Sequence, residues 1–183
     1  MKVFVVIIIF QFLGLNAQTL YHSEQNKASM TVTGTSTIHD WELKVEDIKH
    51  TGSITMEGNK LLKINQLDIT VAVNSIKSAK DLMDNKTYEA LNEADHPAIS
   101  FKLITAIPEG NDNVTSTGEL TIAGKTRKVT VNVRYKIYET FIEFQGELTL
   151  KLSDYEITPP TVLMGTIKTG DEVTISFSIP FPR

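Results

Sequence analysis

Apolar and polar residues alternate one by one through most of this chain of 183 residues. Between positions 29 and 38, for example, Met30 and Val32 occupy even positions, while serine and threonine fill the odd ones. Successive side chains of a β-strand point to opposite faces, so a period of two indicates strands buried on one face. The same period recurs over residues 67–74, 99–103, 114–122, 129–137, 142–152 and 173–179. We therefore predict an all-β chain of about eight or nine antiparallel strands.

One segment, residues 78–94 with the sequence SAKDLMDNKTYEALNEA, departs from this alternation. Ser78 is suited to cap a helix N-terminus, and Asp81 follows three positions later. The apolar positions that follow have helical spacing: Leu82, Met83, Ala90, Leu91 and Ala94. We expect one helix over roughly 78–94, inserted between the middle strands and ending before His96 and Pro97.

The strands must hide their edges and bury one face each, and two architectures would achieve this. A closed barrel leaves no edge, whereas a two-sheet sandwich fits the same alternation. The choice matters because an eight-stranded barrel has an interior that is filled by side chains or holds one ligand. The AGKT sequence at 123–126 is better interpreted as a hairpin turn than as the end of a phosphate loop, because strands flank it.

The segment DYEITPPTVLMGTIKTGDEV, residues 154–173, is too long and too interrupted by proline for a hairpin. Loops of this length are often lids or mouths of functional sites. The alternative is a well-packed connection that covers one end of the barrel, with Asp154 bonding local backbone groups.

The first 17 residues have the features of a secretory signal peptide: Lys2, an apolar run from Val3 to Leu15, and the small residue Ala17. A membrane anchor is the alternative, but the run spans only about 20 Å as a helix, short of the roughly 30 Å hydrocarbon layer. We expect cleavage after Ala17, a flexible lead-in over 18–27 and one domain over 28–183. The mature protein would then be exported, with no stable membrane span.

Composition excludes several classes of partner and of stabilising group. The chain has no cysteine, so core packing must stabilise it without disulfides. Its net charge is −4, and no block of basic residues could neutralise several phosphates, so a nucleic-acid partner is not expected. Hydrophobic residues make up 41% of the chain, enough for one substantial core.

The stretch GTSTIHDWEL, residues 34–43, suggests a catalytic cluster because it holds Ser36, His39 and Asp40. Residues 39 and 40 of an extended chain point to opposite faces, which argues against a hydrolytic triad. The apolar residues change from even positions, ending at Ile38, to odd positions, beginning at Trp41. A bulge or tight turn must therefore lie at His39 and Asp40, making a structural corner from which Trp41 returns to the apolar side.

A metal site would need ligands from separate strands. No two histidines are two or four residues apart, the spacing that places two ligands on one strand or helix face. The four histidines are His22, His39, His50 and His96. We predict no catalytic residues, no metal and no cofactor.

Five stretches, in order, give the chain its resemblance to a known family: VTGTSTIHDW, VAVNSIKS, HPAISF, GELTIAGKTRKVTV and FQGELTLKLSDYEITPP. Together they resemble the YceI-like, polyisoprenoid-binding family of exported bacterial proteins. The resemblance implies a lipocalin-like antiparallel barrel whose interior binds an amphiphile with an isoprenoid tail. It supplies no catalytic residues, and GTSTIHDW and DYEITPP set this chain apart from the better-known members.

The apolar rows supply the candidate lining of such a barrel. Burial contributes about 0.8 kcal/mol per methylene and association costs roughly 4–15 kcal/mol, so a long tunnel that encloses several prenyl units is expected. The candidate lining residues are Leu43, Ile69, Val71, Val73, Phe101, Leu103, Leu120, Val131, Val133, Phe144, Leu148, Leu150 and Phe177. Met83, Tyr88 and Leu91 are expected to cover an entrance.

Three functions therefore compete. The first is an exported carrier or sequestering protein for an isoprenoid or other long-chain lipid. The second is a structural or stress-related interaction module with a solid core, which would show an exposed apolar patch instead of a cavity. The third is an enzyme acting on a lipid head group, with His39, Asp40 and Asp154 as its candidate residues.

Overall fold

A computed structural model describes residues 21–22, 28–110, 112–162 and 165–182, so the expected signal peptide lies outside the described residues. Most of the described residues lie in strands. The described helical elements are α1 (Asp81–Ala90) and two short 3-10 turns, η1 (Val73–Ser75) and η2 (Leu152–Tyr155). The strands are β1 (Tyr21–His22), β2 (Ser29–Ser36), β3 (Trp41–Val45), β4 (Ile48–Glu57), β5 (Lys60–Ala72), β6 (Ile76–Lys77), β7 (Ala98–Glu109), β8 (Asn113–Ile122), β9 (Lys125–Ile137), β10 (Phe141–Lys151), β11 (Thr161–Val162) and β12 (Ile167–Pro182).

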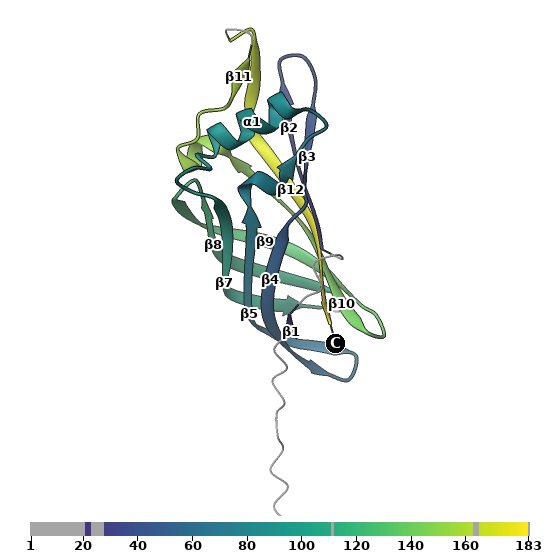
Figure 1. Cartoon of the computed structure of the whole chain (residues 1–183). Helices are drawn as coiled ribbons and strands as arrows, with labels where there is room; N and C mark the ends of the chain where they lie inside the picture. The colour runs from purple at the N-terminus through teal and green to yellow at the C-terminus, as the bar shows by residue number, and fades with distance from the viewer. Residues whose placement is uncertain (1–20, 23–27, 111, 163–164, 183) are drawn as a thin grey trace, which may run out of the picture.

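The strands form one antiparallel sheet in the order β1-β4-β5-β7-β8-β9-β10-β12-β2-β3-β6, with β11 paired to β12. The sheet curls around an interior, and α1 lies across its upper end beside the β2–β3 hairpin (Figure 1). Among the described residues, no strand pairing joins β4 to β3 or β6. The all-β, lipocalin-like fold with one helix is confirmed, as a curled half-barrel rather than a two-sheet sandwich.

The hairpin predicted at AGKT is present between β8 and β9. Ile122 pairs with Lys125, and the two residues between them have positive φ, 47° at Ala123 and 75° at Gly124. Two consecutive residues with positive φ are typical of the tight turn that matches the twist of a hairpin. This turn belongs to a β-hairpin, with a strand rather than a helix following it.

Two boundaries in the sheet differ from the sequence predictions. The prediction missed β4 and the first half of β5, because register shifts between Ser53 and Ile54 and between Thr55 and Met56 disturb the alternation there. The segment 154–173 was predicted as one long loop, which is wrong for its second part, because β12 begins at Ile167. A register shift between Thr169 and Val173 obscures the alternation at that point.

Helix α1 is shorter than predicted at both ends. Lys80, not Ser78, is its N-cap residue, because the Ser78 hydroxyl accepts from the Lys80 amide at 3.0 Å in a turn before the helix. The Asp84 carboxylate reaches back and accepts from the Ser78 amide at 2.6 Å. Beyond Ala90 the chain continues as turns, and Asn92 has a left-handed φ of 50°.

The core consists of two clusters inside the same curled sheet. The first lies beneath α1 and is built around Leu43, Val73 and Tyr155. The second is built around Leu61, Ile142 and Ile179, the last two of which are 0% and 2% exposed. Ile69 and Leu148 are partly buried and pack against both clusters, so they connect the two parts of the core.

Candidate functional site

A cavity of about 340 Å³ lies between α1 and the inner face of the sheet. Its walls come from β2, β3 and β12 on the sheet side and from Met83, Ala90 and Leu91 on the helix side. Two of its lining residues, Ile38 and Leu82, are 61% and 66% exposed to solvent. The cavity therefore opens to solvent between the β2–β3 turn and the first turn of α1.

A second cavity of about 140 Å³ lies deeper in the barrel. The two cavities have five lining residues in common, so they adjoin across this shared wall. These residues are Val32, Ile76, Ile99, Ile122 and Ile175. Along β12, every second residue from Ile167 to Phe181 except Asp171 lines one cavity or the other, over a distance of roughly 45 Å at the usual rise per strand residue.

The two cavities differ in polarity. Among the described residues that line the deep cavity, Ser116 is the one polar member. The upper cavity has six polar lining residues beside its apolar wall: Ser36, His39, Lys80, Lys86, Thr87 and Thr169. The passage is therefore apolar at its inner end and carries its polar groups in the part that opens to solvent.

The candidate lining residues from the sequence divide into three groups. Nine line the deep cavity: Ile69, Val71, Phe101, Leu120, Val131, Val133, Phe144, Leu148 and Phe177. Leu43 and Leu150 line the upper cavity. Val73 and Leu103 line neither, because Val73 is 1% exposed within the core beneath α1 and Leu103 packs against the second cluster. These two candidate residues therefore lie outside both cavities.

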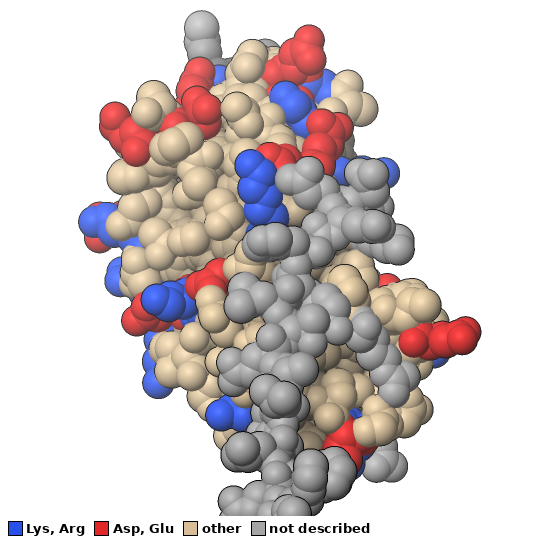
Figure 2. All heavy atoms as spheres, turned by 60° about the horizontal axis from the view of Figure 1, so that its bottom comes forward, with Lys and Arg blue, Asp and Glu red and all other residues tan. Residues whose placement is uncertain are grey.

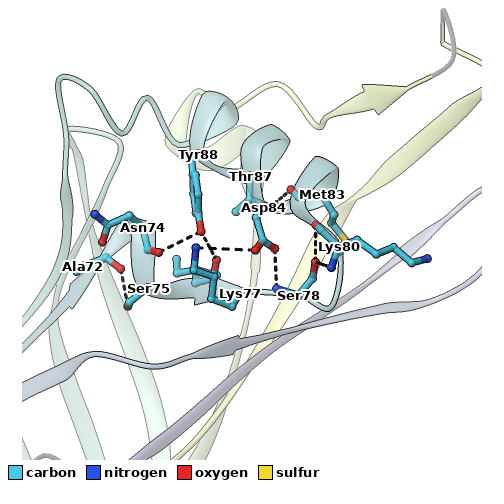
Figure 3. Close-up of polar contacts among 11 residues, drawn as sticks. Ala72, Asn74, Ser75, Lys77, Ser78, Lys80, Met83, Asp84, Thr87 and Tyr88 are labelled. Carbon is cyan, nitrogen blue, oxygen red and sulfur yellow. Dashed lines mark hydrogen bonds and ion pairs between the residues drawn. The ribbon is translucent and has the colours of Figure 1, made fainter.

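Of the three residues expected at an entrance, Met83 and Leu91 line the upper cavity and Tyr88 does not. The Tyr88 hydroxyl instead donates to the backbone carbonyls of Asn74 at 3.0 Å and Ile76 at 3.1 Å. Figure 3 shows the Tyr88 side chain pointing from α1 toward this backbone. Tyr88 therefore fixes the helix to the sheet rather than covering an opening.

Lys77 and Asp84 strengthen the same attachment. The Lys77 ammonium lies 5.1 Å from the centre of the Tyr88 ring and 3.9 Å from the Asp84 carboxylate, whose side chain is nearly buried (Figure 3). Hydrogen bonding to the Tyr88 hydroxyl is the main cause that raises the pKa of Lys77, and the charge of Asp84 acts in the same direction. One face of α1 is thus held by polar contacts while another faces the cavity.

The structure places a hairpin turn at the predicted corner, between β2 and β3. The Ser36 amide and hydroxyl both donate to the His39 carbonyl, at 3.1 and 2.7 Å. The Trp41 indole donates to the Thr35 carbonyl at 2.9 Å. His39 and Trp41 both line the upper cavity, whereas Asp40 does not, so the corner forms part of the cavity wall.

These contacts do not assemble a hydrolytic triad. The Ser36 hydroxyl bonds the backbone of His39, not its ring. His39 Nδ1 lies 2.8 Å from the Asp40 carbonyl, and Asp154 uses its own carbonyl to accept from the Arg127 side chain at 2.9 Å. Among the described residues, no group of three or more potential ligands could hold a metal ion.

Four residues that define the mouth were not predicted from the sequence: Ile38, Leu82, Lys80 and Lys86. Leu82 was assigned to the apolar face of the helix, and Ile38 to a strand row. No local sequence signal marks these residues, because they come together only where α1 lies across the end of the sheet.

Comparison with known proteins agrees with this architecture. The model of the YceI-like domain family matches residues 17–181. The crystal structure of Burkholderia cenocepacia BcnA is similar with a TM-score of 0.73 and 19% identity, over 86% of this chain and 98% of that one. The crystal structure of a YceI protein from Campylobacter jejuni is similar with a TM-score of 0.62 and 16% identity, over 100% of this chain and 99% of that one.

A third similar structure is a polyisoprenoid-binding domain from Saccharophagus degradans that is implicated in plant cell wall breakdown. Its TM-score is 0.65 at 14% identity, over 90% of this chain and 98% of that one. No curated protein matches the sequence. Within the part of the chain that the structure describes, no helix has the length and hydropathy needed to cross a membrane.

Proposed function

Since the chain belongs to the YceI-like domain family and encloses two adjoining apolar cavities, we propose that it binds an isoprenoid or similar long-chain lipid. The lipid tail lies in the barrel interior, and the protein acts as an exported carrier or sequestering protein. The family resemblance noted in the sequence and the polyisoprenoid-binding domain of S. degradans support this ligand class. The signal-peptide pattern of residues 1–17 supports export to the periplasm or the medium.

The observation that carries the proposal is the passage that starts between Ile38 and Leu82 and continues to the deep cavity. Because burial contributes about 0.8 kcal/mol per methylene, an apolar wall of this length favours a long tail over a short one. The deep cavity offers one serine as its polar lining among the described residues. A polar group would lose its hydration there without adequate compensation, so the polar end of the ligand stays near the mouth.

The alternative of an interaction module with a solid core is disfavoured by the cavities themselves. An empty interior forfeits packing contacts, and proteins leave few voids larger than a water molecule unless they are used. Binding accounts for the cavities, whereas a purely structural role leaves their cost without a function.

The test is to purify the full chain from a bacterial host without detergent, extract it with organic solvent and analyse the extract by mass spectrometry. We expect a prenyl or acyl lipid at a stoichiometry approaching one. Ile175→Trp, at the wall shared by the two cavities, should reduce the recovered lipid strongly. Thr130→Trp, on the exposed face of β9, is the matched control and should leave it unchanged.

Repeated extraction without any such lipid, together with failure of added long-chain lipids to bind, would contradict the proposal. Equal lipid recovery from the Ile175→Trp variant and from wild type would show that the lipid binds elsewhere on the protein.

A further inference from the structure

The charged side chains that line the upper cavity are all basic. Lys80 and Lys86 line it together with His39, and no aspartate or glutamate occurs among its described lining residues. This is unexpected in a chain whose net charge is −4. Acidic residues close by in sequence, such as Asp40, Asp81 and Glu89, stay out of the lining.

Lys80 is the more available of the two lysines. It precedes α1 as the N-cap residue, and its backbone, not its ammonium, makes the contacts with Ser78. Figure 3 shows its side chain leading away from the Ser78 and Asp84 contacts. Within the described part of the chain, no ion pair or hydrogen bond occupies the Lys80 ammonium.

The Lys86 ammonium forms a weak ion pair on the surface of α1. Its ammonium pairs with Glu89 one turn along α1, and both side chains are substantially exposed, at 37% and 65%. Exposed pairs of this kind contribute little, typically under about 1 kcal/mol. A ligand anion can therefore replace Glu89 at small cost.

His39 adds a third polar group at the mouth. A carbonyl oxygen only accepts hydrogen bonds, so the 2.8 Å contact with the Asp40 carbonyl assigns the proton to Nδ1. Nε2 then remains as the ring atom that can contact a ligand, and it becomes a donor when the ring is protonated.

We infer that the mouth selects an amphiphile with an anionic head group, a phosphate or a carboxylate, held by Lys80 and Lys86 beside His39. This inference rests on the proposed function, because it assumes that the tail occupies the passage. A lysine ammonium is a compact charge that suits phosphate and carboxylate oxygens. At the rim of an apolar cavity such contacts are screened less than in open water.

The test compares three ligands with the same tail: geranylgeranyl monophosphate, geranylgeranoic acid and the neutral geranylgeraniol. Binding to the full chain is followed by the fluorescence of Trp41, the single tryptophan, which lines the upper cavity. We expect the wild type to bind at least one anionic ligand about tenfold or more tighter than the alcohol. The comparison between the two acids decides whether phosphate or carboxylate is preferred.

The double variant Lys80→Gln, Lys86→Gln should lose this preference, so that its affinities for the two anionic ligands fall to its affinity for the alcohol. The control is Lys63→Gln, Lys128→Gln, because these two exposed lysines line neither cavity. The preference should persist in the control and weaken with added salt.

Equal affinities of the wild type for all three ligands would overturn the inference and leave the proposed function standing. Persistence of the preference in the Lys80→Gln, Lys86→Gln variant would also overturn it. If none of the three ligands binds, the inference fails, and the extraction of a bound lipid decides the proposed function separately.

Discussion

The hydroxyl of Tyr88 donates a hydrogen bond to the backbone carbonyl of Ile76 at 3.1 Å. Tyr88 lies on α1, and Ile76 lies on β6 and lines both cavities. The contact therefore connects the helix that covers the upper cavity to the wall that the two cavities share. How readily α1 moves away from the sheet depends on this contact and on the pair formed by Lys77 and Asp84.

Tyr88→Phe should loosen α1 while leaving the sheet intact. The lost hydrogen bond lowers the stability of the helix attachment by about 1 kcal/mol. Amide hydrogen exchange in α1 should become several-fold faster, with little change in the strands. Tyr138→Phe is the control, because the Tyr138 hydroxyl bonds Glu143 at the β9–β10 hairpin. Exchange in α1 that is unchanged in Tyr88→Phe would show that other contacts hold the helix.

Gly34→Ala should displace the Trp41 ring from the wall of the upper cavity. A Cβ atom on Gly34 would lie 2.3 Å from Cζ2 of Trp41, a distance that the rigid ring can avoid only by moving. We expect a change in tryptophan emission and a loss of about 1–3 kcal/mol in the free energy of unfolding. The control is Ser29→Ala, at the exposed start of the same strand, which should change neither the tryptophan emission nor the free energy of unfolding. An unaltered emission spectrum in Gly34→Ala would mean that the backbone moves and the ring does not.

The sequence predicted the sheet well because burial on one face imposes a period of two. Leu120 and Ile122 follow this period without interruption, and both are buried. The prediction failed where register shifts interrupt the period, in β4 and at the start of β12. Each shift changes which positions face the core, so the alternation cannot be followed through it.

The cavity lining was harder to predict than the strands. Val71 and Val73 are two residues apart and equally apolar, yet Val71 lines the deep cavity and Val73 is packed solidly in the core. The difference arises because Val73 begins the 3-10 turn η1, where the chain leaves the strand. Lys80 and Leu82 belong to the mouth only because α1 lies across the end of the sheet, which is a tertiary relationship without a local signal.

His50 should make stability depend on pH around neutrality. It is 4% exposed, its Nε2 lies 3.0 Å from the Pro180 carbonyl, and burial lowers its pKa below the ordinary 6.5. Below pH 6.5 the unfolded chain therefore binds a proton at His50 more readily than the folded protein does. The free energy of unfolding should fall as pH drops from about 7.5 to about 5.5, by linkage.

Denaturant unfolding at a series of pH values checks this prediction. His50→Gln should flatten the slope in that range, and substitution of the exposed His39 by glutamine should retain it. The carboxyl pKa values of Glu156 and Asp171 are lowered below 4.5 and 3.8 by their partners Lys125 and Ser153, so these groups titrate at lower pH. An equal slope in the wild type and His50→Gln would contradict the role assigned to His50.

The charges on the lower surface have a different arrangement from the lysines at the mouth. On the face seen in Figure 2, basic and acidic side chains are interspersed among uncharged ones over the described residues. Among the described residues visible in Figure 2, basic side chains do not gather into one region, whereas Lys80 and Lys86 line the mouth together. Loading of a lipid is accordingly expected at the mouth.

The double variant Ile38→Ser, Leu82→Ser should slow the uptake of a lipid from vesicles without unfolding the protein. Both side chains are already more than half exposed, so their replacement should change the free energy of unfolding by no more than about 0.5 kcal/mol each. At the mouth, however, they offer the lipid tail its first apolar contact as it leaves the bilayer. Transfer of a fluorescent long-chain lipid from vesicles should therefore slow several-fold.

The matched control is Ile104→Ser, Ile107→Ser, two isoleucines of β7 that are 53% and 56% exposed and line neither cavity. Equal slowing in both double variants would show that general surface hydrophobicity, rather than the mouth, governs uptake.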